Sequence, residues 1–237
     1  MHRATPQWFI SMESHKLRKK AIDSIDQTNF YPEKGKTRIR SMIETRPDWC
    51  ISRQRSWGVP LPIFIDKKTN EPLRDPEVIE NIAKIYEKEG SDCWFHDDPQ
   101  RFLGKKYNKD NYIKSKDIVE VWFDSGSTHS FVLEKRKDLK WPASMYLEGS
   151  DQHRGWFHSS LLESCGTRGR APFESILSHG FVVDGKGMKM SKSAGNIISP
   201  EDILKKYGAD ILRLWVASSD YAEDLRIDHT ILEQHAE

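Results

Sequence analysis

Short apolar runs alternate with amphipathic segments along the chain, and together they predict its elements. The apolar runs end in turn-forming residues, which is typical of strands. They lie at 7–12, 61–65, 118–123, 145–148, 175–181 and 181–183. The stretch from about 91 to 115 is polar and rich in turns, so we expect a peripheral insertion there.

Other segments place apolar residues at helical spacing and predict helices. The clearest spans 76–89, because an Asp-Pro pair opens it and Gly90 closes it. Ser199-Pro200 opens another in the same way, and Asp151 is expected to cap the helix that follows the strand at 145–148. The remaining helices are expected at 14–25, 34–45, 151–165, 200–207 and 209–217, with a further one beginning in the tail, 220–237.

Composition narrows the class of protein. The 237 residues suffice for one large or two modest domains. The 37 Lys and Arg residues nearly balance 36 Asp and Glu residues, so any contact with RNA would need a local patch. The three cysteines lack metal-like spacing, and Cys93 and His96 have no second pair nearby, so we expect no zinc or other metal site. The odd cysteine count, with no signal or membrane-spanning segment, predicts a cytoplasmic protein without a membrane partner.

The strongest chemical signal is a lysine-rich stretch at 185–193, which reads Gly-Lys-Gly-Met-Lys-Met-Ser-Lys-Ser. Asp184-Gly185 is typical of a tight turn, so we expect a small hairpin that leads into a mobile loop. Lysine is a compact cation on a flexible stem, and small neighbours let such a loop close over a polyphosphate. The alternative is a solvated basic loop, which is what most charge runs are.

A second cationic segment, 46–60, combines three arginines with two tryptophans and two prolines. It suits a polyanion, with Arg53 and Arg55 as donors and the rings as stacking platforms. A structural turn held by tryptophan packing explains the same residues equally well.

Polar residues also follow predicted strands at their carboxyl ends, where open α/β sheets bind ligands. Glu148 ends one strand, and Gly149 lets a ligand approach the backbone. The carboxylates of Glu148 and Asp151 could bind ribose hydroxyls or an α-ammonium group, although Asp151 could equally be a simple helix cap. The strand at 118–123 contains Trp122 and runs into a turn of small residues, and a lone tryptophan there could be plain core.

Residues 189–193 read KMSKS, the signature of class I aminoacyl-tRNA synthetases. Over essentially its whole length the chain resembles the bacterial isoleucyl-tRNA synthetases within that class. The motifs that carry the resemblance are 3–9, 49–55, 121–129, 146–156 and 189–193. The sister valyl and leucyl enzymes share 51–54 and a KMSKS loop but differ around Trp122 and 148–151, which favours isoleucine.

The resemblance implies an aminoacyl-tRNA ligase. Such an enzyme forms isoleucyl-adenylate and pyrophosphate from isoleucine and ATP, and then transfers the acyl group to tRNA(Ile). It acts by positioning its substrates and by stabilising charge on the leaving pyrophosphate, with Mg²⁺ associated with the ATP. The implied cofactors of this segment are therefore ATP and Mg²⁺, without zinc.

The resemblance also implies roles for single residues. Lys189 and Lys192 would be catalytic and contact the ATP phosphates. Trp122 and Trp156 would form walls of the isoleucine pocket. Arg53 and Arg55, which the cationic segment offers to a polyanion, are possible tRNA contacts on this interpretation. The residues that would bind the adenylate or ATP, besides Lys192, are Glu148, Gly149, Asp151, Gln152, His179, Gly180 and Met188.

The implied fold is α/β: the C-terminal half of a split Rossmann-like catalytic domain with parallel strands, plus the start of a helical region. We expect a return strand from an editing insertion at 1–12, a connective segment at 13–117, the second Rossmann half with the KMSKS loop at 118–198, and a helical segment at 199–237 that leads to an anticodon-binding domain. The family's HIGH motif is not found, so we expect a missing N-terminal half and an inactive isolated chain. The alternative hypothesis is a non-catalytic, synthetase-derived module that binds RNA or protein.

Overall fold

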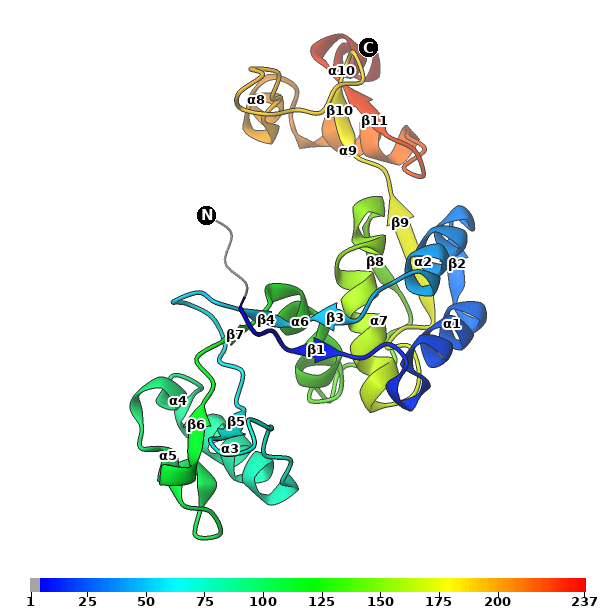
Figure 1. Ribbon diagram of the computed structural model, residues 1–237. Coiled ribbons are helices and arrows are strands. Elements are labelled where there is room, and N and C mark those ends of the chain that lie inside the picture. Colours follow the sequence, from blue (N-terminus) through cyan, green and yellow to red (C-terminus); the bar gives the residue numbers. More distant parts are fainter. Residues whose placement is uncertain (1–4) are drawn as a thin grey trace. The chain divides into compact units, whose positions relative to one another are not determined.

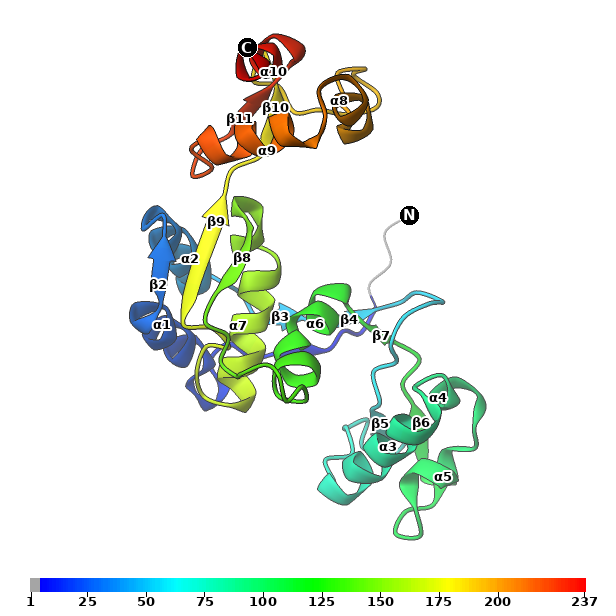
Figure 2. The ribbon, with the colours of Figure 1, turned by 180° about the vertical axis from the view of Figure 1, so that it is seen from behind.

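The structure is a computed structural model that describes residues 5–237. It forms two compact units, and each gathers two separated stretches of chain (Figure 1 and Figure 2). The first unit contains the chain through Lys16 together with Arg46–Ser127, and the second contains Leu17–Thr45 and Thr128–Glu237. The predicted strand at 1–12 begins outside the described residues, and its described part holds β1, Phe9–Ile10. The predicted domain limits at 12, 117 and 198 stay a prediction.

Antiparallel two-stranded ladders form the framework of the first unit. Strand β1 pairs with β3 (Trp49–Cys50), β4 (Ser52–Arg53) pairs with β7 (Ile118–Val119), and β5 (Phe64–Asp66) pairs with β6 (Tyr112–Lys114). The helices of this unit are α3 (Pro76–Glu89), α4 (Cys93–His96), α5 (Pro99–Leu103) and α6 (Val121–Gly126), with 3₁₀ turns at Ser14–Lys16 and Lys109–Asn111.

The predicted start and end of α3 are confirmed. Asp75 accepts a hydrogen bond from the backbone N–H of Glu77 at 2.9 Å, and this satisfies a donor that the first turn of a helix leaves without a partner. Gly90 ends the helix with φ of 83°, a conformation that a residue with a Cβ rarely adopts.

The segment from 91 to 115 contributes more to the core than its polar composition predicts. Trp94 and Phe102 are fully buried and pack in one cluster with Phe64 of β5. The indole N–H of Trp94 donates to the Ser115 carbonyl at 2.9 Å. Helices α4 and α5 are so short that each buries only one or two large side chains, which leaves no periodic pattern for the sequence to reveal.

A parallel sheet in the order β2-β9-β8 lies in the second unit, as the sequence predicted for an α/β fold. Its strands are β2 (Asn29–Tyr31), β8 (Tyr146–Gly149) and β9 (Ser175–His179). Helices α1 (Leu17–Gln27), α2 (Lys34–Glu44) and α7 (Trp156–Thr167) accompany it, with a π-helical turn at His129–Leu133 and a 3₁₀ turn at Ser150–His153 (Figure 1).

The two faces of this sheet differ in exposure. Phe30, Ile176 and Tyr146 are paired across the three strands and are all buried, and the Tyr146 hydroxyl lies 3.1 Å from Ser160 Oγ of α7. The next paired row is Tyr31, Leu177 and Leu147. Within the described residues, Tyr31 and Leu147 each keep 54% of their surface exposed. The helices therefore cover the first row and leave the second row largely open.

Residues 180–237 build a smaller α/β layer within the same unit. Strands β10 (Val182–Asp184) and β11 (Leu225–Ile227) pair in parallel, and α8 (Pro200–Tyr207), α9 (Ala209–Ser218) and α10 (His229–Ala236) pack around a core of Ile203, Trp215, Ile227 and Leu232. The predicted helices at 200–207 and 209–217 are confirmed. The tail was predicted to be helical only, and β11 corrects this. Its Leu-Arg-Ile run is too short and too polar to predict a strand from sequence. The run forms a strand because β10 pairs with it.

Candidate functional site

The carboxyl ends of β8 and β9 meet at one edge of the parallel sheet. Gly149 and His179 are paired across the two strands, and so are Glu148 and Ser178. A Cβ built on Gly149 would lie 2.6 Å from Asp151 Oδ1 and 3.7 Å from His179 Cε1. The structure therefore brings together four of the predicted adenylate-binding residues at the position where open α/β sheets bind ligands. They are Glu148, Gly149, Asp151 and His179.

The turn after β8 differs from our expectation that Asp151 caps a helix. Asp151 lies within the 3₁₀ turn at Ser150–His153, and α7 begins only at Trp156. The side chain of Gln152 takes the capping role, because its Oε1 accepts from the Trp156 N–H at 2.9 Å. Its amide group donates to Asp151 Oδ2 at 3.0 Å. Gln152 thus orients the Asp151 carboxylate and the start of α7 together.

Glu148 and Trp156 flank this turn. The Glu148 side chain is exposed and forms no hydrogen bond or ion pair with any residue from 5 to 237, so water can solvate its carboxylate. No desolvation cost therefore forces it to find a partner within the protein, and it is accessible to a ligand. The Trp156 ring stacks on Tyr146 with a centroid separation of 4.0 Å and an interplanar angle of 4°. One ring face of Trp156 is thereby covered.

Gly180 connects this edge to the smaller layer. Its N–H donates to the Tyr221 carbonyl at 2.9 Å, and a Cβ built on it would lie 2.2 Å from the Glu223 carbonyl oxygen. Any larger residue would force these two backbones apart. His179 Nδ1 lies 2.8 Å from the Gly180 carbonyl oxygen, which fixes the imidazole at the point where β9 leaves the sheet.

The lysine-rich stretch folds back on β10, which confirms the predicted hairpin. Gly187 N–H donates to the Asp184 carbonyl at 2.8 Å, and Asp184 N–H donates to the Met188 carbonyl at 2.9 Å. Lys189 then forms an antiparallel bridge with Val183. Ser199 caps α8 by accepting from Asp202 N–H, also as predicted. The loop between Lys189 and Ser199 is thus held at both ends by regular structure.

Two side chains that the sequence analysis did not single out hold the loop between those ends. Asp184 accepts from the N–H groups of Lys186 and Met188 at 3.0 and 2.8 Å, and from the Asn196 amide at 2.8 Å. Asn196 in turn accepts from Ser191 N–H at 3.0 Å. We call this arrangement the Asp184–Asn196 latch. The bond from Asn196, followed by that from Met188 N–H, holds the pKa of Asp184 below its usual range.

The cations of the loop remain available to a ligand. Lys186, Lys189 and Lys192 are exposed, and none forms an ion pair within the part of the chain that the structure describes. Met188 is also exposed, at 63%. The latch therefore uses backbone groups, an amide and a carboxylate, and leaves the ammonium groups free.

Trp122 and the arginines of 46–60 belong to the first unit, whereas Trp156 belongs to the second. Trp122 lies on α6 and is 42% exposed, so the predicted strand at 118–123 is corrected to a strand that ends at Val119 and a helix that begins at Val121. The apolar residues of this run suit a strand or a helix equally, and β4 provides a pairing partner only for its first two residues. The isoleucine pocket formed by the two tryptophans stays a prediction.

Arg53 is engaged inside the first unit. Its Nη2 pairs with Glu120 Oε2 at 2.9 Å, and its Nη1 donates to the Ser52 carbonyl at 2.8 Å. Glu120 is buried and also accepts from the Trp49 indole N–H at 2.6 Å. Arg53 therefore has a structural role in this unit, whereas Arg55 is exposed and forms no ion pair with the other described residues. The tRNA contact expected for both arginines stays a prediction.

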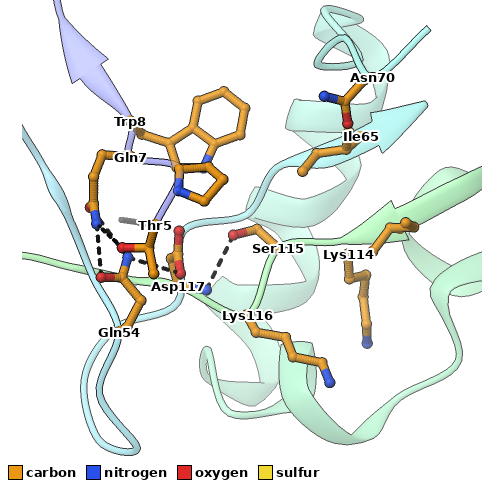
Figure 3. A pocket seen from close by; sticks show the side chains of 12 residues that line it. Thr5, Gln7, Trp8, Gln54, Ile65, Asn70, Lys114, Ser115, Lys116 and Asp117 are labelled. Atoms are coloured by element: carbon orange, nitrogen blue, oxygen red, sulfur yellow. Dashed lines mark hydrogen bonds between the residues drawn. The ribbon is translucent and has the colours of Figure 1, made fainter. Parts of the chain in front are cut away.

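A pocket of about 520 Å³ lies in the first unit, and none of the predicted site residues lines it (Figure 3). Along its wall, Gln7 Nε2 donates to Gln54 Oε1 at 2.8 Å, and Gln54 Nε2 donates to Asp117 Oδ1 at 3.2 Å. Residues 5–237 contain no cluster of three or more side chains suited to hold a metal ion. None of their helices has the length and apolar character that crossing a bilayer would require.

Residues 1–228 match the family model for class I tRNA synthetases specific for isoleucine, leucine, methionine and valine. The chain therefore belongs to the class I tRNA synthetases. Over 237 residues it is 79% identical to the isoleucine–tRNA ligase of Pelagibacter ubique, and this alignment covers 100% of the chain and 26% of that relative. It is 56% identical over 238 residues to the isoleucine–tRNA ligase of Syntrophotalea carbinolica, covering 98% of the chain and 26% of the relative. The chain thus spans about a quarter of the length of these relatives.

Solved structures agree on the fold. The methionyl-tRNA synthetase of Mycobacterium tuberculosis, solved in complex with methionyl-adenylate, superposes with a TM-score of 0.60 at 19% identity, covering 96% of this chain and 36% of that one. The LeuRS of Agrobacterium radiobacter K84, solved with tRNA and LeuAMS, gives a TM-score of 0.56 at 21% identity, covering 80% of this chain and 26% of that one. These structures confirm the predicted α/β fold, and the identity to the two isoleucine–tRNA ligases confirms the resemblance to that family.

Proposed function

We propose that this chain is the part of an isoleucine–tRNA ligase that holds ATP and the aminoacyl-adenylate. The observation that carries the proposal is the 79% identity to an isoleucine–tRNA ligase over all 237 residues. The geometry adds two elements that this reaction needs. One is a sheet edge with polar side chains around Gly149, and the other is a latched loop whose lysines form no ion pair with described residues.

In the first half-reaction, a carboxylate oxygen of isoleucine attacks the α-phosphorus of ATP. The bond between the α-phosphorus and the oxygen that bridges it to the β-phosphate breaks, and pyrophosphate leaves with that oxygen. Lys189 and Lys192 compensate the charge that develops on the leaving group. Mg²⁺ arrives with ATP as part of the substrate. No covalent enzyme intermediate is required, which fits a site that offers cations and hydrogen-bonding groups.

The adenylate would bind along the sheet edge. Glu148 and Asp151 offer carboxylates to ribose hydroxyls, and Gly149 allows close approach of the ligand to the backbone. Gln152 fixes the orientation of Asp151 through its 3.0 Å hydrogen bond. His179, Gly180 and Met188 complete the set of residues that we assign to adenylate or ATP binding.

Trp122 and Trp156 are the residues that we assign to the recognition of the isoleucine side chain. The second half-reaction would transfer the acyl group to tRNA(Ile), with Arg55 and the neighbouring Trp57 as the contact. Trp57 is 89% exposed and can stack on an unpaired base. We propose that the protein acts in the cytoplasm, where its substrates are made.

We further propose that the site is completed by a HIGH-bearing N-terminal half of the same enzyme. The exposed row of Tyr31 and Leu147 on the parallel sheet supports this, because such apolar surface on a soluble protein marks an interaction site. The share of the relatives that the chain spans, 26%, agrees with it.

The test is isoleucine-dependent ATP–pyrophosphate exchange, with this chain alone and with a separately expressed HIGH-bearing half. We expect exchange only in the mixture, with isoleucine preferred over leucine and methionine. Lys192→Ala should abolish it, whereas Lys137→Ala, which removes an exposed lysine outside the loop, should not. Binding of RNA without exchange in any mixture would favour a non-catalytic module and contradict the proposal.

A further inference from the structure

Arg226 lies beside the lysine loop and is not among the residues assigned to the proposed ATP site. It is the parallel ladder partner of Val183, and Lys189 is the antiparallel bridge partner of the same residue. Paired residues in neighbouring strands direct their side chains to the same face. Lys189 and Arg226 therefore flank Val183 on one face, about 10 Å apart at the backbone, which is twice the spacing between neighbouring strands.

The guanidinium of Arg226 reaches the turn of the hairpin. A Cβ built on Gly187 would lie 3.4 Å from its Nη2 and 3.5 Å from its Nε. Gly187 has φ of 80°, which a residue with a side chain rarely adopts. Glycine at this position allows both the turn and the close approach of the guanidinium, so the positive group is held at the base of the loop.

No carboxylate of residues 5–237 pairs with this charge. Arg226 forms no ion pair or side-chain hydrogen bond with residues 5–237. The nearest acids along the ladder have other partners: Asp184 accepts three hydrogen bonds from the hairpin and Asn196, and Asp228 caps α10 by accepting from Ile231 N–H at 2.7 Å. A guanidinium with free donors, next to free lysines, forms a local cationic site on a chain whose net charge is only +1.

We propose that Arg226 binds the polyphosphate of ATP together with Lys189 and Lys192. This inference rests on the proposed function and adds a residue from β11, outside the KMSKS sequence, to the phosphate site. An arginine offers a planar fork that contacts two phosphate oxygens at once, whereas each lysine acts as a point charge. Arg226 is anchored in a strand, so it provides a fixed end against which the more mobile lysines close.

The experiment titrates the 237-residue chain with sodium tripolyphosphate and measures the Kd by calorimetry. Arg226→Gln should raise the Kd about tenfold, the size expected for loss of a charge-assisted hydrogen-bonding group. Arg226→Lys should show a smaller increase, because it keeps the charge and loses the fork. The matched control is Arg38→Gln on α2, an exposed arginine without an ion pair among the described residues, and it should change the Kd less than twofold.

Lys192→Ala separates the two proposals. A weakened Kd in Lys192→Ala with an unchanged Kd in Arg226→Gln overturns the role of Arg226 and leaves the proposed function standing. No binding of tripolyphosphate by the unmodified chain overturns both. If Arg226→Gln lacks the circular dichroism spectrum of the folded chain, the folded Arg226→Lys variant decides, and a Kd equal to that of the unmodified chain then refutes the proposal.

Discussion

Two cationic motifs stand out in the sequence, and they differ at the centre: Arg53 of the first is paired with an acid, whereas Lys189 and Lys192 of the second are not paired with any residue from 5 to 237. In the first unit, Arg53 is paired with the buried Glu120, which also accepts from the Trp49 indole. In the second unit, Lys189 and Lys192 are exposed and have no ion-pair partner among the described residues. The arginine stabilises the fold, whereas the lysines stay accessible, as the proposed binding of phosphate requires.

The difference comes from what each loop uses to hold its shape. The first loop is held by a charged side chain, and burial of Glu120 makes its pairing with Arg53 obligatory. Burial also lowers the pKa of the nearby Arg46, and the charge of Glu120 partly offsets this. The lysine loop is held by the Asp184–Asn196 latch, which bonds mainly to backbone N–H groups. A loop held through its backbone can keep its cations free.

Removing the buried acid should give the largest effect. Glu120→Ala leaves the Trp49 indole N–H without its acceptor and Arg53 without its counter-charge. We expect the free energy of unfolding of the first unit to fall by about 3 kcal/mol, the lower end for a broken buried pair because Arg53 is partly exposed. Urea unfolding followed by tryptophan fluorescence measures this. Glu71→Ala, an exposed acid of the same unit, is the control, and an equal loss in both variants would show that the pairing contributes nothing.

An intermediate effect is expected from the latch. Asn196→Ala removes the bonds to Asp184 and Ser191, so the lysines lose their fixed positions. We expect the Kd for tripolyphosphate to rise about tenfold, comparable to one charge-assisted contact, while the exposed loop adds little to global stability. Ser193→Ala is the control, because among residues 5–237 the Ser193 side chain has Ser191 Oγ, at 3.2 Å, as its only hydrogen-bond partner. Equal binding by Asn196→Ala and the unmodified chain would show that the latch does not position the cations.

The smallest effect concerns pH. The folded-state pKa of Asp184 is lowered from its usual 3.8, so the carboxylate stabilises the loop at pH values above 3.8 and this contribution is lost as the pH falls through the lower, folded value. We expect the amide resonances of Lys186 and Met188 to stay constant from pH 7 to 5 and to shift only below 3.8. Asn196→Ala should move that midpoint upward. A midpoint above 3.8 in the unmodified chain would contradict the latch.

The sequence predicted the elements whose signals are local. Asp75-Pro76, Ser199-Pro200 and Gly90 fix helix ends through bonds and φ values within a few residues, and these ends are confirmed. The hairpin after β10 follows from Asp184-Gly185 in the same way. Where the outcome depended on a distant partner, prediction failed: β11 needs β10, and the run at 118–123 becomes a helix where β4 no longer pairs with it.

By itself, the sequence determined the family, the parallel α/β fold and the identity of the loop lysines, because these follow from ordered motifs and short-range patterns. Only the tertiary structure decided which charges are free. Glu120 lies 67 residues from Arg53, and Arg226 lies 37 residues from Lys189, so no local pattern distinguishes the paired arginine from the unpaired one. Whether a cation is satisfied depends on which carboxylates the fold brings within hydrogen-bonding distance, and chain folding sets that distance across long separations in sequence.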